Sequence, residues 1–149
     1  MDFITKLFDM DLSALVPEIS VFLGATRAIL VLAVLLGPVL LLVLATMYLL
    51  RPAPEANFKY GFRTYYGMGS IEAWQFSQKI AGLAFGVLGV LLLIAMFAIV
   101  LTFGKNDLMQ FAGTVVVCLL GQIGLVLIAR SVVAILCRTY FDKDGNRRK

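Results

Sequence analysis

Histidine is absent from this chain of 149 residues, and charged residues make up only 15% of it. Without imidazole groups, the sequence has no histidine ligands for a metal and lacks the commonest general base, which excludes His-rich metal sites and histidine-based acid–base catalysis. Soluble domains typically contain about a quarter charged residues. The shortage of charge, together with a hydrophobic fraction of 61%, indicates an integral membrane protein.

Cysteine is also scarce, with single residues at positions 118 and 137. Both fall on one predicted helix, 19 residues and therefore roughly 28 Å apart, which is too far for a disulfide bond. We expect Cys118 and Cys137 to be small apolar packing residues. The Ser, Asp and Glu residues are few and scattered, and none forms an evident pair of nucleophile and base. We therefore expect no enzyme activity, no cofactor and no metal.

Long hydrophobic runs, in contrast, are abundant. Uncharged apolar segments occupy residues 28–50, 80–103 and 108–129. About 20 apolar residues cross the hydrocarbon core of a bilayer, which is roughly 30 Å thick. The sequence therefore predicts an all-α integral membrane protein with three transmembrane helices. The remaining residues are too few for a separate soluble catalytic domain.

Residues 1–27 precede the first span and carry apolar residues at helical spacing, namely Ile4, Phe8, Leu12 and Leu15. This pattern predicts an amphipathic helix that lies in the membrane interface. Asp11 interrupts the apolar face, and Pro17-Glu18 would suit the start of a second helix before the span. The basic start that a secretory signal peptide needs is missing, so we do not expect one.

Lysine and arginine are distributed unevenly between the two predicted sides of the membrane. Nine lie in the connector 51–79 or in the C-terminal segment: Arg51, Lys59, Arg63, Lys79, Arg138, Lys143, Arg147, Arg148 and Lys149. The other side has three: Lys6, Arg27 and Lys105. Since basic residues favour the cytoplasmic side, we expect a bacterial cytoplasmic-membrane protein with its N-terminus outside and its C-terminus inside. Basic residues beside spans favour anionic lipid headgroups as partners over nucleic acid.

Within the spans, a few residues indicate how the helices pack. Gly37-Pro38, near the middle of the first span, predicts a kink. Gln122 in the third span is expected to form an interhelical hydrogen bond, or less often to line a pathway. Five glycines are placed to let another helix approach closely, within the bundle or in a homo-oligomer: Gly82, Gly86, Gly89, Gly121 and Gly124.

The third hydrophobic segment is longer than a bilayer requires. Residues 108–141 could form one helix of 34 residues, about 51 Å long, of which some 20 Å would extend beyond the hydrocarbon core. A turn at residues 104–107 precedes this helix, and a basic tail at residues 142–149 follows it. Arg130 and Arg138 lie eight residues apart on the extension, and so on roughly one face.

The connector of residues 51–79 has an unusual composition for a loop between spans. Arg51-Pro-Ala-Pro54 must end the first helix. Ser70 is a candidate N-cap, with Glu72 in the first turn, for a short helix that continues through Trp74 into the second span. The residues between these two points are rich in glycine and aromatic side chains, which favour sharp turns at the headgroup level.

Arg63 is the strongest candidate binding residue, because its guanidinium has five donors and stays charged. It could bind a carboxylate, a lipid phosphate or backbone carbonyls, or it could pair with Glu72 and fix the connector. Trp74 is either an interfacial anchor or part of a binding face. We also expect the connector to dock on the extended third helix through a pair of Glu72 with Arg130 or Arg138.

Six connector residues form a pattern that ends in a span: Asn57, Gly61, Arg63, Thr64, Glu72 and Trp74. Over about residues 54–100 this pattern resembles the SdpI family of small bacterial membrane proteins, with departures at Tyr65 and in Gly67-Met-Gly69. The resemblance implies a membrane binding protein that gives immunity to, or senses, a membrane-active peptide toxin. It also implies that the six residues bind a ligand or partner.

Two other roles are compatible with the sequence. The chain is small and its glycine faces could contact a partner membrane protein, so it could be a structural or accessory subunit of a larger transport complex. A homo-oligomeric pore or transporter is the second role, since a pore can be lined by subunit interfaces. The spans contain no ionisable acidic or basic residue before Arg130, which disfavours transport by a single chain.

Overall fold

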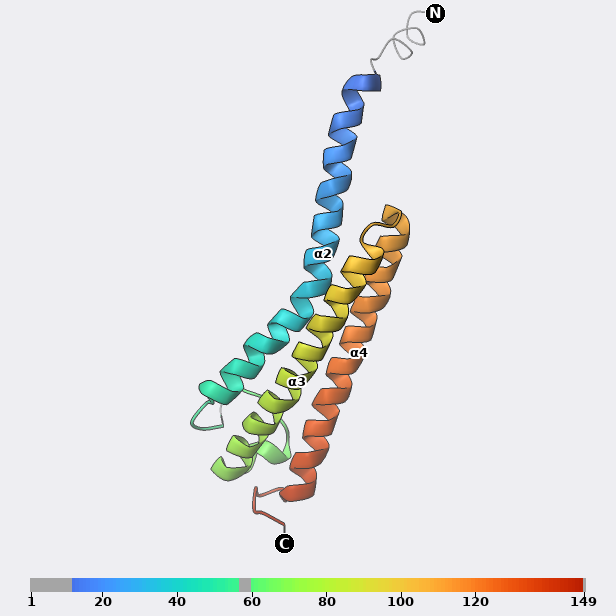
Figure 1. Cartoon of the computed structure of the whole chain (residues 1–149). Coiled ribbons are helices and arrows are strands. Elements are labelled where there is room, and N and C mark those ends of the chain that lie inside the picture. The colour runs from blue at the N-terminus through green and yellow to red at the C-terminus, as the bar shows by residue number, and fades with distance from the viewer. Residues whose placement is uncertain (1–11, 57–59, 149) are drawn as a thin grey trace, which may run out of the picture.

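The computed structural model describes residues 12–56 and 60–148 of the chain. Three long helices, α2 (Leu12–Leu50), α3 (Ile71–Phe103) and α4 (Leu108–Tyr140), run antiparallel in sequence order (Figure 1). A short 3-10 helix, η1 (Tyr66–Met68), lies in the connector between α2 and α3. The described residues contain no strand, only an isolated bridge between Phe141 and Arg147. The predicted all-α architecture is therefore confirmed.

Each of the three helices is long and apolar enough to cross a membrane: Ser20–Leu50, Ile71–Phe103 and Leu108–Tyr140. Each buries only a narrow stripe against its neighbours, and large apolar side chains such as Leu32, Ile94 and Val117 are exposed around the bundle. An outward apolar surface of this kind suits a hydrocarbon solvent, in which helices satisfy their own backbone groups. We therefore describe the chain as a multi-pass membrane protein.

The N-terminal part of α2 differs from the prediction. The predicted second helix start at Pro17-Glu18 is absent, because residues 12–27 continue into the first span as one helix. Membrane helices tolerate an interior proline when other groups satisfy the freed backbone. This part of α2 extends beyond the turn that joins α3 to α4 (Figure 1). Ile4, Phe8 and the rest of residues 1–11 lie outside the described residues.

α2 changes direction part-way along its length (Figure 1). Pro38 has no N–H with which to bond the carbonyl of Val34, four residues earlier. Gln122 of α4 provides the missing donor, because its Nε2 donates to the Val34 carbonyl at 2.9 Å. A Cβ at Gly37 would collide with Oε1 of the same glutamine. The predicted kink and the predicted interhelical hydrogen bond are therefore one polar joint inside the bundle.

The glycines of α3 and α4 have different roles. A Cβ at Gly82 would lie 2.7 Å from Leu49, and one at Gly89 would lie 3.0 Å from Leu42, so both permit close packing of α3 on α2. Gly86 is less crowded, with the Cβ of Ala45 at 3.5 Å. On α4, a Cβ at Gly121 or Gly124 would meet nothing within 4 Å, so neither glycine takes part in packing among the described residues.

Arg27 fixes the end of the bundle opposite the connector. Its guanidinium donates to the carbonyl of Gly104 at 3.1 Å and to that of Asn106 at 2.6 Å. These carbonyls belong to the end of α3 and the following turn, where helical donors run out. An arginine on α2 therefore caps α3 and joins the two helices.

We predict that Gln122→Leu lowers the free energy of unfolding in detergent micelles by about 1 kcal/mol, because the Val34 carbonyl loses its donor. Pro38→Ala restores an N–H at position 38 that can bond the Val34 carbonyl. Gln122→Leu should therefore cost much less free energy of unfolding in the Pro38→Ala background. The two costs together form a double-mutant cycle. If Gln122→Leu cost the same free energy of unfolding with and without Pro38, Gln122 would not be the donor that replaces the missing N–H.

Candidate functional site

The connector folds onto the first turns of α3 through Trp74. The Trp74 side chain is fully buried, and its Nε1–H donates to the carbonyl of Ala53 at 2.8 Å. Gly61 packs flat against the indole: a Cβ there would lie 2.6 Å from Cζ2 of Trp74. Gly61 also has φ of 112°, a backbone conformation that favours glycine. Trp74 is therefore a buried anchor of the connector. Position 61 requires glycine, because any side chain there would meet the indole ring and strain the backbone.

A second contact comes from Gln78, one turn further along α3. Its Oε1 accepts the Phe62 N–H and its Nε2 donates to the Phe62 carbonyl, both at 2.8 Å. The Phe62 ring packs edge-on against Phe85 and Tyr48, with centroids 5.6 Å and 6.4 Å away. Gln78 was not among the site residues that the sequence predicted. A buried amide at the start of a span is the signal that could have marked it, because such a group must be satisfied.

Thr64 links the connector to α4. Its hydroxyl oxygen accepts the Gly67 N–H at 2.9 Å, which shapes η1, and it also contacts the thiol of Cys137 on α4. A Cβ at Gly67 would collide with Oγ1 of Thr64 and would lie 3.0 Å from Ser77. Thr64 is therefore a link between η1 and α4, and it also lines the cleft beside Arg63.

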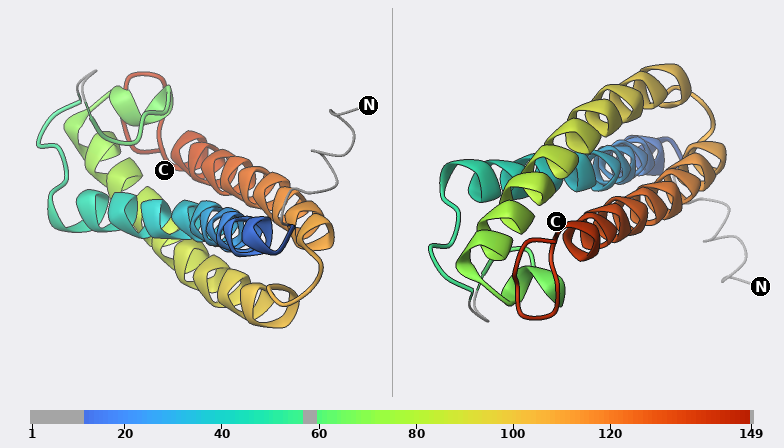
Figure 2. Two further views of the ribbon diagram at one scale, coloured as in Figure 1. Left: turned by 90° about the horizontal axis from the view of Figure 1, so that it is seen from above. Right: turned by 90° about the horizontal axis from the view of Figure 1, so that it is seen from below.

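The C-terminal segment, which the sequence predicted as a basic tail, is folded onto the start of α3. Ser70 is the predicted N-cap of α3, since its Oγ accepts the Ala73 N–H at 3.1 Å, and it also donates to the Gly145 carbonyl at 2.7 Å. The Phe141 ring is buried 5.3 Å from Phe76 of α3. Figure 2 shows this segment (red) beside the start of α3 and η1 (green).

Asp142 closes the C-terminal turn. Hydrogen bonds to its carboxylate, first from the Asn146 backbone N–H at 2.7 Å and then from that of Asp144 at 3.0 Å, hold the pKa of Asp142 below its usual value. The ionised carboxylate therefore organises the turn.

Glu72 pairs with Arg147, with Nη1 and Oε1 3.9 Å apart and both side chains about two thirds exposed. The predicted pairing of Glu72 with Arg130 or Arg138 is wrong for the described residues. The reason is rotational: Glu72 lies beside the C-terminal turn, whereas Arg130 and Arg138 face the connector from α4. An exposed pair of this kind contributes little to stability.

Arg63 is exposed and lies beside the two arginines of α4. Arg63, Arg130 and Arg138 line one cleft of about 390 Å³ together with Tyr65 and Tyr66. Arg63 and Arg130 also line an adjoining cavity of about 410 Å³ that reaches Tyr48 of α2. We call these three arginines the arginine cluster. The six pattern residues therefore differ in position. Gly61 and Trp74 are internal, Thr64 links η1 to α4 at the edge of the cleft, and Arg63 and Glu72 are exposed. Asn57 lies outside the described residues.

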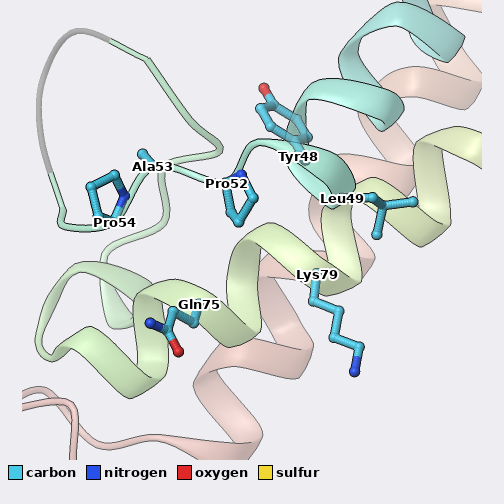
Figure 3. Close-up of a pocket in the computed structure, with 7 residues that line it drawn as sticks. All are labelled: Tyr48, Leu49, Pro52, Ala53, Pro54, Gln75 and Lys79. Carbon is cyan, nitrogen blue, oxygen red and sulfur yellow. The ribbon is translucent and has the colours of Figure 1, made fainter.

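A further cavity of about 440 Å³ also has Tyr48 in its lining (Figure 3). The segment Pro52–Pro54 passes over it, and Gln75 and Lys79 of α3 form its opposite wall. The Lys79 ammonium points away from the prolines in Figure 3. Lys79 is the one cation among the described residues that line this cavity, so the arginine cluster is the stronger anion site.

Comparison with known families identifies the family of this chain. Residues 55–137 match the model of the SdpI/YfhL protein family, which covers more than half of the 149 residues. The chain belongs to this family. The predicted resemblance is confirmed, and the match extends beyond the predicted residues 54–100 to include α4 up to Cys137. Searches of curated proteins and of solved structures gave no match.

The matched region contains the connector, α3 and most of α4, and it excludes α2. Two members of the arginine cluster, Arg63 and Arg130, lie inside it, and Arg138 is one residue past its end. Membership in the SdpI family and the three spanning helices together make this a multi-pass membrane protein of that family.

We predict that Gly61→Ala destabilises the connector by about 1–3 kcal/mol, because alanine is strained at this φ and its Cβ meets the Trp74 ring. Faster proteolysis between α2 and α3 and a lower unfolding temperature would report the change. Gly124→Ala is the matched control, since nothing lies near its Cβ position, and it should change stability by less than about 0.5 kcal/mol. Equal effects of both substitutions would refute this role of Gly61.

Proposed function

We propose that this SdpI-family member is a binding protein without enzyme activity that protects a bacterium from a membrane-active peptide or senses it. The observation that carries the proposal is the exposed position of Arg63 on a connector in which Trp74 is buried and Gly61 is packed against it. The bonds of Gln78 to both backbone groups of Phe62 fix the neighbouring residue, so Arg63 is presented on a rigid support.

The exposed face of the connector has the composition of a protein-binding surface. Tyr65 is 73% exposed and Tyr60 is 49% exposed on the same connector as Arg63. Tyrosine and arginine are among the residues that most often dominate binding energy at protein interfaces. A partner with a carboxylate, such as an acidic side chain or the C-terminus of a peptide, would complement the guanidinium groups.

The distribution of basic residues supports an orientation in which the connector and the C-terminal turn face the cytoplasm. On that side, the connector would contact a peptide that has crossed into the inner leaflet, or a cytoplasmic protein that reports its presence. The bacterial cytoplasmic membrane and the outside position of the N-terminus are parts of this proposal.

We predict that Arg63→Ala lowers the peptide concentration at which growth is inhibited by about tenfold, since loss of one charged anchor commonly costs that much binding. Cells that express each variant at equal level are challenged with a membrane-active peptide. Arg51→Ala is the control, because Arg51 is an exposed arginine at the same end of the bundle. Trp74 is unsuitable here, since its buried ring holds the connector together.

Unchanged resistance of the Arg63→Ala cells, at a concentration that inhibits cells without the protein, would exclude the connector as the contact site. An equal loss for Arg51→Ala would show that only total charge matters.

The alternative role as a subunit of a larger membrane complex has one supporting observation. Gly121 and Gly124 leave part of α4 open to another helix, whereas Gly82 and Gly89 are already used within the bundle. We predict that a subunit would be purified in mild detergent with a partner at fixed ratio, and that Gly121→Leu would release it. A single chain or a simple homo-oligomer by native mass measurement would exclude that role.

A further inference from the structure

A groove runs between α2 and α4 from the middle of the bundle toward the connector. Its inner part has a volume of about 270 Å³ and is lined by apolar side chains, including Leu41, Ile123 and Leu127. The polar side chain that lines it is Gln122, whose Nε2 is already bonded to Val34. The inner part of the groove is therefore suited to hydrocarbon and not to a polar ligand.

The groove changes character toward the connector. Leu41 lines both the inner part and the 410 Å³ cavity, as does Val126, and that cavity also contains Arg63 and Arg130. The same two arginines line the 390 Å³ cleft with Arg138. The three spaces therefore adjoin one another through shared lining residues, and their order runs from an apolar end to the arginine cluster, in the region where α2 and α4 diverge (Figure 1).

The depth of this groove corresponds to one leaflet. Arg130 directly follows the uncharged run 108–129 of α4, so its backbone lies where hydrocarbon gives way to headgroups. Gln122 and Arg130 are eight residues and about 12 Å apart along α4, close to the thickness of half a hydrocarbon core.

The charge at the outer end is of one sign. The described residues that line the three spaces include three arginines and no aspartate or glutamate. Within the described residues, neither Arg130 nor Arg138 has a carboxylate partner, because the ion pair that forms at this end joins Glu72 to Arg147. Guanidinium groups bind phosphate oxygens through paired, charge-assisted hydrogen bonds.

We infer that this groove binds one anionic phospholipid, with the phosphate at Arg63 and Arg130 and an acyl chain against Leu127 and Ile123. An occupant that is both anionic and long-chained fits both parts, since the apolar part and the cavities at the arginine cluster adjoin along one groove. Ile123 is 59% exposed and Leu127 is 56% exposed on the lipid-facing side, so a membrane lipid enters sideways from the bilayer. The inference does not rest on the proposed protection against a peptide.

The test is native mass spectrometry of the full chain in mild detergent, titrated with phosphatidylglycerol or with phosphatidylcholine. We expect one phosphatidylglycerol to bind at least tenfold more tightly than phosphatidylcholine. Arg130→Gln should weaken phosphatidylglycerol binding about tenfold, as loss of a charged hydrogen bond does, and Arg138→Gln serves as a second variant. Arg51→Gln is the charge-matched control and should leave binding unchanged.

The apolar part is tested separately. Leu127→Trp fills the groove from an exposed position and should reduce phosphatidylglycerol binding several-fold, whereas Ile128→Trp, 60% exposed and outside the groove lining, should not. Circular dichroism checks that each variant keeps its helices.

Several results would overturn the inference. Equal binding of the two lipids, or equal weakening by Arg51→Gln, would mean non-specific attraction. Competition by glycerol phosphate as strong as that by the lipid, with no effect of Leu127→Trp, would mean a site for soluble anions. Lipid binding is measured without any peptide, so the two proposals can fail separately. Resistance of Arg130→Gln cells to the peptide would not contradict the lipid site. Failure of lipid binding would not contradict the proposed protection against a peptide.

Discussion

The paired hydrogen bonds between the Gln78 amide and the backbone of Phe62 are the contact on which the connector depends. All four polar atoms are buried, so each needs a partner, and the flat amide satisfies both backbone groups of Phe62 at once. This places the Phe62 ring between Tyr48 and Phe85 and the next residue, Arg63, at the surface. The candidate site is therefore a consequence of one buried polar contact on α3.

The same physical rule operates at two other places in the bundle. Gln122 satisfies the carbonyl that Pro38 leaves open, and Arg27 satisfies carbonyls at the end of α3. Backbone groups without partners are expensive in a hydrocarbon solvent, whereas apolar side chains gain little from leaving it. In this protein a few polar side chains that bond backbone groups therefore fix how the apolar helices pack. The glycines of α3 permit the close approach of α2.

The sequence predicted the three spans, the Ser70 cap, the glycine packing of α3 and an interhelical bond from Gln122. These features depend on local pattern or on a single polar group that must find a partner. The prediction that named a partner for Glu72 was wrong, because Glu72 pairs with Arg147. Which residues meet across helices depends on the rotation of each helix about its axis, and similar apolar faces leave that rotation undefined in the sequence.

The sequence by itself determined that this is a three-span helical membrane protein with an unusual connector, because the length of an apolar run and the scarcity of charge are set by composition alone. The tertiary structure decided which pattern residues are internal and which face out. Trp74 and Thr64 proved to be supports, and Arg63 came to lie beside Arg130 and Arg138, more than sixty residues away in the chain. Residues so far apart meet only when the folded backbone brings α4 against the connector, and no local pattern encodes that contact.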